Sequence, residues 1–282
     1  MIYYSTSSFA KKNPVKSIKY LNSIGIKNIE LSSGKKIKNL EKKIISLSKK
    51  NNFIIHNFFP PNDPNLVLNL ASSNSNIIKK SIKHYKKVIS LTKKINATFF
   101  SIHAGFTIDP APKELGKLLF QHKETNRRVH IKRYITNVKK IANLSKKLNL
   151  MVFIENNVIT KKNFKKYGFN PFLMCDVKEI KKILSCLPSN VKLMLDTGHL
   201  KVSAKTLGFN KFKAIKDLKK FIGGYQLSDN NSYIDLNSQF NKRVWFIKYI
   251  DFSKPISLEV YLKNKKEIYR QYKLLNKLNE KK

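Results

Sequence analysis

The segment 191–200, with the sequence VKLMLDTGHL, constrains the fold of this chain more than any other stretch. Its first five residues are apolar except for Lys192, as expected for a strand buried on both faces of a parallel sheet. Asp196 ends the run, and a Thr-Gly pair lets the chain turn before His199. A carboxylate and an imidazole thus leave the carboxyl end of one strand together, which is where α/β proteins bind ligands. The same Asp could instead only cap the helix that follows, since Asp is a frequent N-cap residue.

Apolar runs that end in a polar residue recur along the chain. Residues 150–154 run into Glu155, residues 255–258 run into Glu259, and a shorter run between them has Gln226 near its end. Carboxylates at the ends of parallel strands converge if the sheet closes into a barrel, and converging carboxylates repel one another unless a cation lies among them. Polar residues of this kind lie at or just beyond the ends of the second to the eighth expected strands. They are Glu30, His56, His103, Glu155, Asp196 with His199, Gln226 and Glu259.

Strand and helix signals alternate along the whole chain, which predicts an α/β fold with a parallel sheet. The expected strands are 2–5, 25–31, 53–55, 98–102, 150–154, 191–196, 224–229 and 255–258. The expected helices are 14–23, 37–50, 76–95, 128–148, 177–187, two short pieces around Gly208 that end by 222, then 240–250 and 265–278. Segments 107–126 and 160–174 are expected to be irregular excursions. Eight strand–helix pairs in 282 residues predict a single (β/α)8 TIM barrel domain over 1–282, since that fold typically needs ~250 residues.

The composition argues against a secreted or membrane protein. No stretch approaches the ~20 apolar residues of a membrane span, and the opening MIYYSTSSFAKK lacks the basic-then-apolar order of a signal peptide. Cys175 and Cys186 are the only cysteines and have no CxxC spacing, which indicates reduced thiols rather than a disulfide framework. We therefore expect a cytoplasmic protein without membrane association.

The net charge of +40 would suit a polyanionic partner, because Lys and Arg neutralise phosphates. Arg is the residue favoured for bidentate phosphate and base recognition, yet nearly all the cations are Lys. Lys pairs such as 42–43 and 219–220 are spread over the expected helices, and abundant Lys, Asn and Ile also fit a coding bias toward AT-rich codons. We interpret the charge as a solvated surface and expect no specific nucleic-acid binding. Arg occurs only at positions 127, 128, 133, 243 and 270.

Seven motifs, in the order IELSSG, IIHNFFPP, FSIHAGF, FIENN, MLDTGHLKVSA, YQLSDN and ISLEVY, resemble those of the xylose isomerase-like TIM barrels. That family includes sugar isomerases, sugar 3-epimerases, inosose dehydratases and endonuclease IV, and the resemblance covers essentially the whole chain. In its epimerase-like members a divalent metal is held by Glu, Asp, His and Glu from strands five to eight. The ligand set that the resemblance implies here is Glu155, Asp196, Gln226 and Glu259. Gln226 departs from the family, because it offers a neutral amide oxygen where the family has imidazole. This oxygen set favours Mn²⁺ or Mg²⁺, with Zn²⁺ and Co²⁺ as alternatives.

The resemblance also implies a metal-dependent sugar or sugar-phosphate isomerase or epimerase that transfers a proton through an enediolate. A divalent metal beside the sugar carbonyl would lower the pKa of the carbon-bound proton and stabilise the enediolate. Glu155 and Glu259 would then act as general base and general acid. The residues implied to bind substrate are Glu30, His56, His103 and His199. The partner is then a small carbohydrate, and the sequence leaves oligomerisation open.

Two other functions are left open by the residues. An endonuclease IV-like enzyme that cleaves abasic DNA in repair would need a trinuclear zinc site, and the His and carboxylate residues above match most of it. Gln226 and the segment from Asp235 to Asn237 depart from that pattern, and the loss of two imidazoles should empty or weaken two of the three zinc sites. The other function is sugar binding without catalysis, which the fold alone does not exclude.

Overall fold

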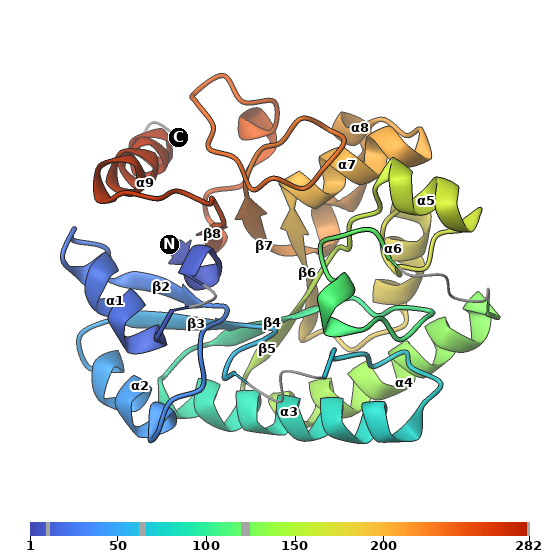
Figure 1. The fold of residues 1–282 in the computed structure, drawn as a ribbon, viewed down its shortest axis with the longest axis horizontal. Coiled ribbons are helices and arrows are strands. Elements are labelled where there is room, and N and C mark those ends of the chain that lie inside the picture. Colours follow the sequence, from blue (N-terminus) through green and yellow to red (C-terminus); the bar gives the residue numbers. More distant parts are fainter. Residues whose placement is uncertain (10–11, 62–65, 120–124, 281–282) are drawn as a thin grey trace.

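The computed structural model describes residues 1–9, 12–61, 66–119 and 125–280, and it confirms the TIM barrel (Figure 1). Parallel strands β1 to β8 follow one another around the barrel in chain order, and β8 pairs with β1 to close it. The strands are β1 (Ile2–Ser5), β2 (Asn28–Leu31), β3 (Asn52–His56), β4 (Phe99–His103), β5 (Met151–Glu155), β6 (Val191–Asp196), β7 (Ile222–Leu227) and β8 (Ile256–Leu258).

Helices surround the barrel, and Asn side chains begin several of them. Asn13 accepts hydrogen bonds from the backbone amides of Val15 and Lys16, and Asn264 accepts one from Glu267, which satisfies amides that have no partner within the helix. No helix in the described ranges is long and apolar enough to cross a membrane. The helices are α1 (Pro14–Asn22), α2 (Leu40–Ser48), α3 (Ser75–Lys94), α4 (Arg127–Lys146), α5 (Lys161–Tyr167), α6 (Val177–Ser185), α7 (Thr197–Leu207), α8 (Lys211–Leu218) and α9 (Lys265–Asn279).

The two-residue period of the strands divides the core into two parts. In β5, Val152 and Ile154 pack outward against the helices, whereas Phe153 belongs to a separate cluster inside the barrel. Phe153 stacks on Phe99 with ring centroids 4.4 Å apart. The next inward position of β5 is Glu155, so the strand changes from apolar to charged at the barrel mouth. The interior cluster consists of Tyr3, Ile54, Phe99, Phe153 and Met194.

The prediction of a basic helix over 240–250 was wrong. This segment forms turns and one short 3-10 helix, η4 (Ile247–Tyr249), although Phe246 and Ile250 are buried in the core. Its backbone finds partners elsewhere, because the Phe240 amide donates to Gln271 Oε1 on α9 at 3.1 Å. Turn hydrogen bonds within the segment, such as that from the Ile247 amide to the Val244 carbonyl, and this contact with α9 take the place of a continuous helix. Conversely, the segment 160–174, predicted to be irregular, contains α5.

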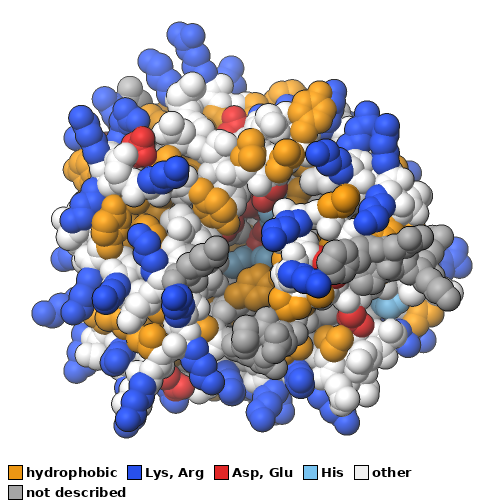
Figure 2. Space-filling view, in the orientation of Figure 1, with side chains coloured by type: hydrophobic (Ala, Val, Ile, Leu, Met, Phe, Trp, Pro, Cys, Tyr) orange, Lys and Arg blue, Asp and Glu red, His pale blue; other side chains and the backbone are white. Residues whose placement is uncertain are grey.

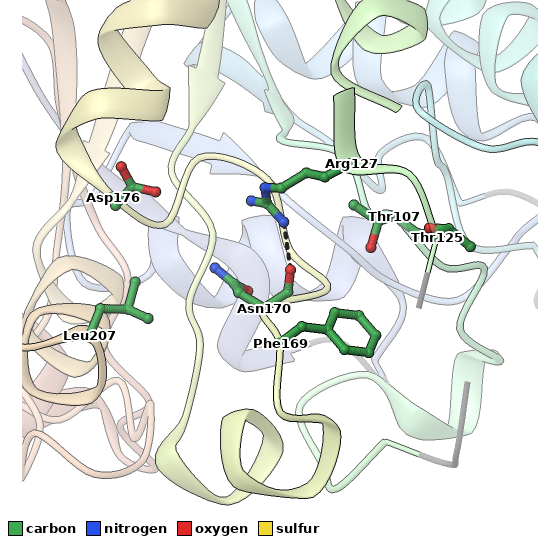
Figure 3. Close-up of a pocket in the computed structure, with 7 residues that line it drawn as sticks. All are labelled: Thr107, Thr125, Arg127, Phe169, Asn170, Asp176 and Leu207. Atoms are coloured by element: carbon green, nitrogen blue, oxygen red, sulfur yellow. Dashed lines mark hydrogen bonds between the residues drawn. The ribbon is translucent and has the colours of Figure 1, made fainter. Parts of the chain in front are cut away.

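Arg127, at the start of α4, joins the segments that follow β4 and β5 (Figure 3). Its guanidinium donates to both carboxylate oxygens of Glu179, at 2.6 and 2.8 Å, and to the backbone carbonyls of Asn170 and Phe172. A hollow of about 180 Å³ lies beside it, lined by Thr107, Thr125, Arg127, Phe169, Asn170, Asp176 and Leu207. Because the only cation among these lining residues is already held by protein groups, we assign this hollow a structural role.

Candidate active site

A ring of polar side chains lies at the carboxyl ends of the barrel strands, one step beyond the apolar interior cluster. Most of its members are buried, and the imidazole of His103 is the most exposed of them at 24%. Figure 2 shows acidic and His side chains in a hollow near the middle of one face, with Lys and Arg spread around it. The ring is formed by Glu30 on β2, His56 on β3, His103 on β4, Glu155 on β5, Asp196 on β6, Gln226 on β7 and Glu259 directly after β8.

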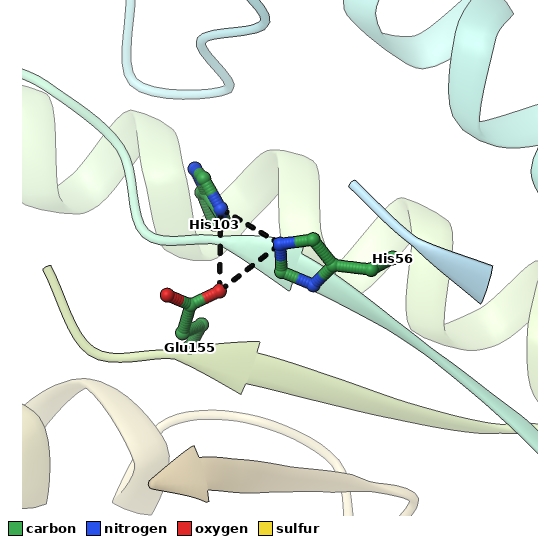
Figure 4. Close-up of side chains that lie close together, drawn as sticks. All are labelled: His56, His103 and Glu155. Carbon is green, nitrogen blue, oxygen red and sulfur yellow. Dashed lines mark hydrogen bonds and ion pairs between the residues drawn. The ribbon is translucent and has the colours of Figure 1, made fainter. Parts of the chain in front are cut away.

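His56, His103 and Glu155 form a compact triangle (Figure 4). The two Nε2 atoms are 2.9 Å apart, and each lies 3.2 Å from Glu155 Oε2. The other ring nitrogen of His56 is held by Ser101 Oγ at 2.7 Å, which fixes the orientation of the imidazole. Ligands of a tetrahedral ion with bonds of 2.0–2.1 Å lie about 3.3 Å apart, so the triangle has the size of one face of such a site.

Asp196 has two roles at the start of α7. Its Oδ1 accepts a hydrogen bond from the His199 amide at 2.7 Å, so Asp196 is the N-cap of the helix, as the simpler interpretation of the sequence proposed. Its Oδ2 is buried and has no hydrogen-bond partner among the described residues. One oxygen is therefore structural, and the other is available to a ligand. Ligand atoms of Glu155, Asp196 and His199 lie within 4.8 Å of one another and form a second metal-sized group.

His199 lies between carboxylates from two directions. Its Nδ1 is 2.9 Å from Glu155 Oε1 and 2.8 Å from the Asn156 carbonyl, and its Nε2 is 3.2 Å from Asp235 Oδ2. Burial opposes the charged form, but the carboxylates of Asp196, Asp235 and Glu155 outweigh it and raise the pKa of His199 well above its usual value. The surrounding carboxylates therefore favour the imidazolium form of His199, and its two N–H groups already face protein acceptors.

The loop from Asp229 to Ser238 brings Asp235 to this site. Its ends pair through an antiparallel bridge, and Asn230 Nδ2 within it donates to the carbonyl of Gly198 at 2.9 Å. A Cβ on residue 198 would lie 2.6 Å from Ser228 Oγ and 3.0 Å from Asp235 Oδ1. Any other residue at 198 would force these loop side chains to shift, so glycine allows the loop to approach the start of α7 closely.

The side-chain amide of Gln226 has its nitrogen turned toward Glu30. Its Nε2 donates to Glu30 Oε1 at 3.2 Å across the barrel, and both side chains are completely buried. Its Oε1 has no hydrogen-bond partner among the described residues. Burial raises the pKa of Glu30 to about 7, an effect that the nearby hydroxyls of Ser5 and Ser257 partly offset.

The two glutamates expected to transfer protons have opposite electrostatic environments. Burial alone would raise the pKa of Glu155, but the three neighbouring imidazoles outweigh it and hold that pKa well below its usual value. Burial, reinforced by the charges of Glu155 and Asp196, raises the pKa of Glu259 well above its usual value. Paired carboxyl groups whose pKa values are pushed apart in this way suit one base and one acid.

The ring also has the features of a divalent cation site. Asp196 Oδ2, Gln226 Oε1 and one oxygen of Glu30 are buried acceptors without hydrogen-bond partners in the described part of the chain. Such acceptors are costly unless a ligand satisfies them. Burial and the charges of Glu155 and Asp235 raise the pKa of Asp196 to about 7, although His199 opposes this rise. A bound cation would relieve this repulsion, so the residues present fit such an ion.

The family model for the xylose isomerase-like TIM barrel matches residues 18–276. The chain therefore belongs to the xylose isomerase-like TIM barrel family. A search of functionally curated proteins finds no match. The resemblance inferred from the seven sequence motifs is thus confirmed.

Solved structures of xylose isomerase-like barrels share the fold over nearly the whole chain. A D-tagatose 3-epimerase-like protein is 17% identical with a TM-score of 0.73, over 99% of this chain and 98% of that one. A putative xylose isomerase from Rhodospirillum rubrum is 11% identical with a TM-score of 0.70, over 99% and 98%. A D-psicose 3-epimerase from Clostridium cellulolyticum, solved with D-tagatose, is 13% identical with a TM-score of 0.63, over 99% and 94%. At these identities the likeness shows the fold alone.

The structure brings the residues singled out in the sequence to the barrel mouth, but only some of them lie in the two groups of metal-binding size. Of the four implied metal ligands, Glu155 and Asp196 lie in one metal-sized group with His199, and Glu259 lies outside both groups. Glu155 belongs to both groups and is the centre of the site. His56 and His103, which were expected to bind substrate, also have the spacing of metal ligands around Glu155.

Sequence reasoning left Asp235 out of the site. It appeared only as the remnant of a zinc-binding motif in the endonuclease alternative, yet its carboxylate contacts His199. The sequence signal that could have pointed to Asp235 is its position as an acidic residue among Tyr233, Ile234 and Leu236 in a polar loop. These three apolar residues are exposed in the structure. Asn156 was also missed, although its side chain bonds the backbone of Asp196 in both directions, at 2.8 and 3.2 Å.

A second layer of residues supports His103 from behind. Asn57 Oδ1 accepts hydrogen bonds from Tyr85 Oη at 2.7 Å and from the His103 amide at 3.3 Å. His84 Nε2 donates to the Asn57 carbonyl at 2.9 Å. Burial lowers the pKa of His84 to about 4, so this imidazole is neutral in the folded protein.

The neutral form of His84 predicts acid sensitivity. Because the folded pKa is below the unfolded value of about 6.5, the unfolded chain takes up a proton first, and the stability that neutral His84 provides is lost as pH falls below 6.5. We expect His84 to account for a loss of about 2 kcal/mol in the free energy of unfolding between pH 7.5 and pH 5. Urea unfolding of wild type and His84→Gln at both pH values measures it, and equal pH dependence in the two proteins would contradict the assignment.

Proposed function

We propose that this protein is a metal-dependent sugar or sugar-phosphate isomerase or epimerase. The observation that carries the proposal is the pair of buried glutamates, Glu155 and Glu259, in opposite electrostatic environments at the mouth of one barrel. Epimerases and isomerases among the structural neighbours support the choice of carbohydrate as substrate. The cation is Mn²⁺ or Mg²⁺ if the oxygen ligands dominate, and Zn²⁺ or Co²⁺ if the imidazoles do.

In this mechanism Glu155 removes a proton from the carbon next to the sugar carbonyl, and Glu259 delivers one from the other side. The two residues come from β5 and from the end of β8, so a substrate lying across the mouth has one glutamate on each side. His199, whose ring nitrogens lie against Glu155 and Asp235, would place positive charge beside a substrate oxygen. A divalent ion held by Glu155, Asp196 and Glu259, with Gln226 Oε1, would supply positive charge beside the reacting oxygens.

Proton transfer can be tested without knowing the natural substrate. The protein, supplied in turn with Mn²⁺, Mg²⁺, Co²⁺ and Zn²⁺, is incubated in D₂O with D-tagatose, D-psicose, D-fructose and L-ribulose, the sugars that the neighbouring structures name. Proton NMR should show loss of the signal from a carbon next to the carbonyl and the appearance of an epimer or isomer. Sugar binding with no exchange under any metal would favour the non-catalytic barrel.

Cleavage of abasic DNA is the second candidate, because the His56–His103–Glu155 triangle and the His199–Asp235 pair suit zinc as well as manganese. The basic surface makes DNA binding a fair test. We expect only weak binding to a duplex, falling by about 10³ or more between 50 and 200 mM salt, because dispersed Lys residues neutralise phosphates without reading bases. Zinc-dependent nicking of an abasic duplex that Glu155→Gln abolishes would instead make DNA repair the function.

A further inference from the structure

We propose that Glu30 is a positioning residue that holds the amide of Gln226 by its Nε2, so that Oε1 is left free to bind a cation. The inference rests on the proposed cation site and adds a residue behind it. It also explains how a neutral Gln can serve at a position where the resemblance led us to expect imidazole.

The geometry of the pair is the first observation. Gln226 lies on β7, in register with Asp196 on β6 and Ser257 on β8. Its amide reaches across the barrel to Glu30 on β2, with Nε2 3.2 Å from Oε1. Both side chains have no exposure to bulk solvent. Among the described residues the amide makes no other side-chain hydrogen bond.

The second observation is the oxygen that the bond leaves free. Gln226 Oε1 is buried and has no hydrogen-bond partner among the described residues. An amide oxygen accepts and can bind a cation, whereas the NH₂ group only donates. If the amide were rotated by half a turn, Oε1 would meet the Glu30 carboxylate and NH₂ would face the cation site. Glu30 in its ionised form only accepts hydrogen bonds, so it selects the orientation that leaves Oε1 free for a cation.

Exchanging Glu and Gln between positions 30 and 226 conserves the total charge. This double variant separates a positioning role of Glu30 from an effect of its charge alone. In Glu30→Gln, residue 30 can donate as well as accept, so the amide of Gln226 loses its preferred orientation. In the double variant with Gln226→Glu, the amide at 30 donates to a carboxylate at 226 whose two oxygens are equivalent, so orientation no longer matters. If Glu30 acted only through its charge, its loss would weaken cation binding equally in both backgrounds.

The first readout is calorimetric titration of Mn²⁺ into wild type, both single variants and the double variant, with Glu41→Gln as the control for the same change at an exposed site. Glu30→Gln is expected to weaken binding about tenfold when residue 226 is Gln, and to leave it unchanged or tighter when residue 226 is Glu. Equal weakening in the two backgrounds, or no weakening in either, would overturn the proposal.

The second readout needs no metal. Nitrogen-15 NMR detects the side-chain NH₂ of Gln226, which is assigned by its absence in Gln226→Glu. In wild type these protons should exchange slowly, and in Glu30→Gln they should shift and exchange faster. Unchanged resonances would overturn the proposal even if Mn²⁺ binds. A wild type that binds no Mn²⁺ but shows the expected amide shift would refute the cation site and leave the orienting role of Glu30 standing.

Discussion

Replacing Glu155 by Gln is expected to lower the exchange of substrate protons with solvent by about a thousandfold, the scale of a lost general base. Glu155 is the group on which the site converges, since its carboxylate lies within 3.2 Å of His56 and His103 and within 2.9 Å of His199. The amide removes the negative charge and the proton-accepting oxygen while keeping the shape of the side chain. Proton NMR in D₂O with the sugar that wild type turns over measures the effect.

Glu41→Gln is the matched control for this experiment. Glu41 is exposed and pairs with Lys94 on the surface, so the same chemical change there should leave the rate unaltered. A Glu155→Gln protein that retains the wild-type rate would show that the barrel mouth is not the catalytic site. Loss of activity with an unchanged melting temperature would separate catalysis from folding.

Divalent cations are expected to stabilise the wild-type protein strongly. Ligand at 100 times its dissociation constant adds about 2.7 kcal/mol to the free energy of unfolding, which corresponds to several degrees in melting temperature for a domain of this size. Asp196→Asn and Glu259→Gln should each abolish most of this shift, because each removes one of the carboxylates that attract the ion. Without metal, both variants should be as stable as wild type or more so, since removing a buried carboxylate relieves repulsion.

Thermal unfolding with EDTA and with excess Mn²⁺ or Zn²⁺ measures both effects. Asp196→Asn is preferred to an alanine, because Asn can still cap α7. Asp217→Asn, a change at a partly exposed residue of α8, is the control and should keep the full shift. An unchanged metal-induced shift in both site variants would show that the cation binds elsewhere or that the stabilisation is not specific.

The local pattern gave the wrong element in the segment 240–250, where turns and a contact with α9 take the place of a helix. The segment 240–250 contains apolar residues that need burial, and a helix is one way to bury them. The structure buries Phe246 in turns instead, and Gln271 on α9 gives the Phe240 amide a partner that only the folded chain brings into reach. Tertiary context therefore overrode the local preference.

The sequence by itself determined the barrel and which strand-end residues lie at its mouth, but not Asp235 or Asn156. Strand period, strand-end polarity and alternation with helices are local properties, and a closed parallel sheet places every strand end at one mouth. Only the tertiary structure decided which of these groups pair. Glu155 with three imidazoles, Asp235 with His199, and Gln226 with Glu30 join residues from different strands and loops. Their distances depend on the register and closure of the barrel and on the path of one loop past Gly198, which no local pattern encodes.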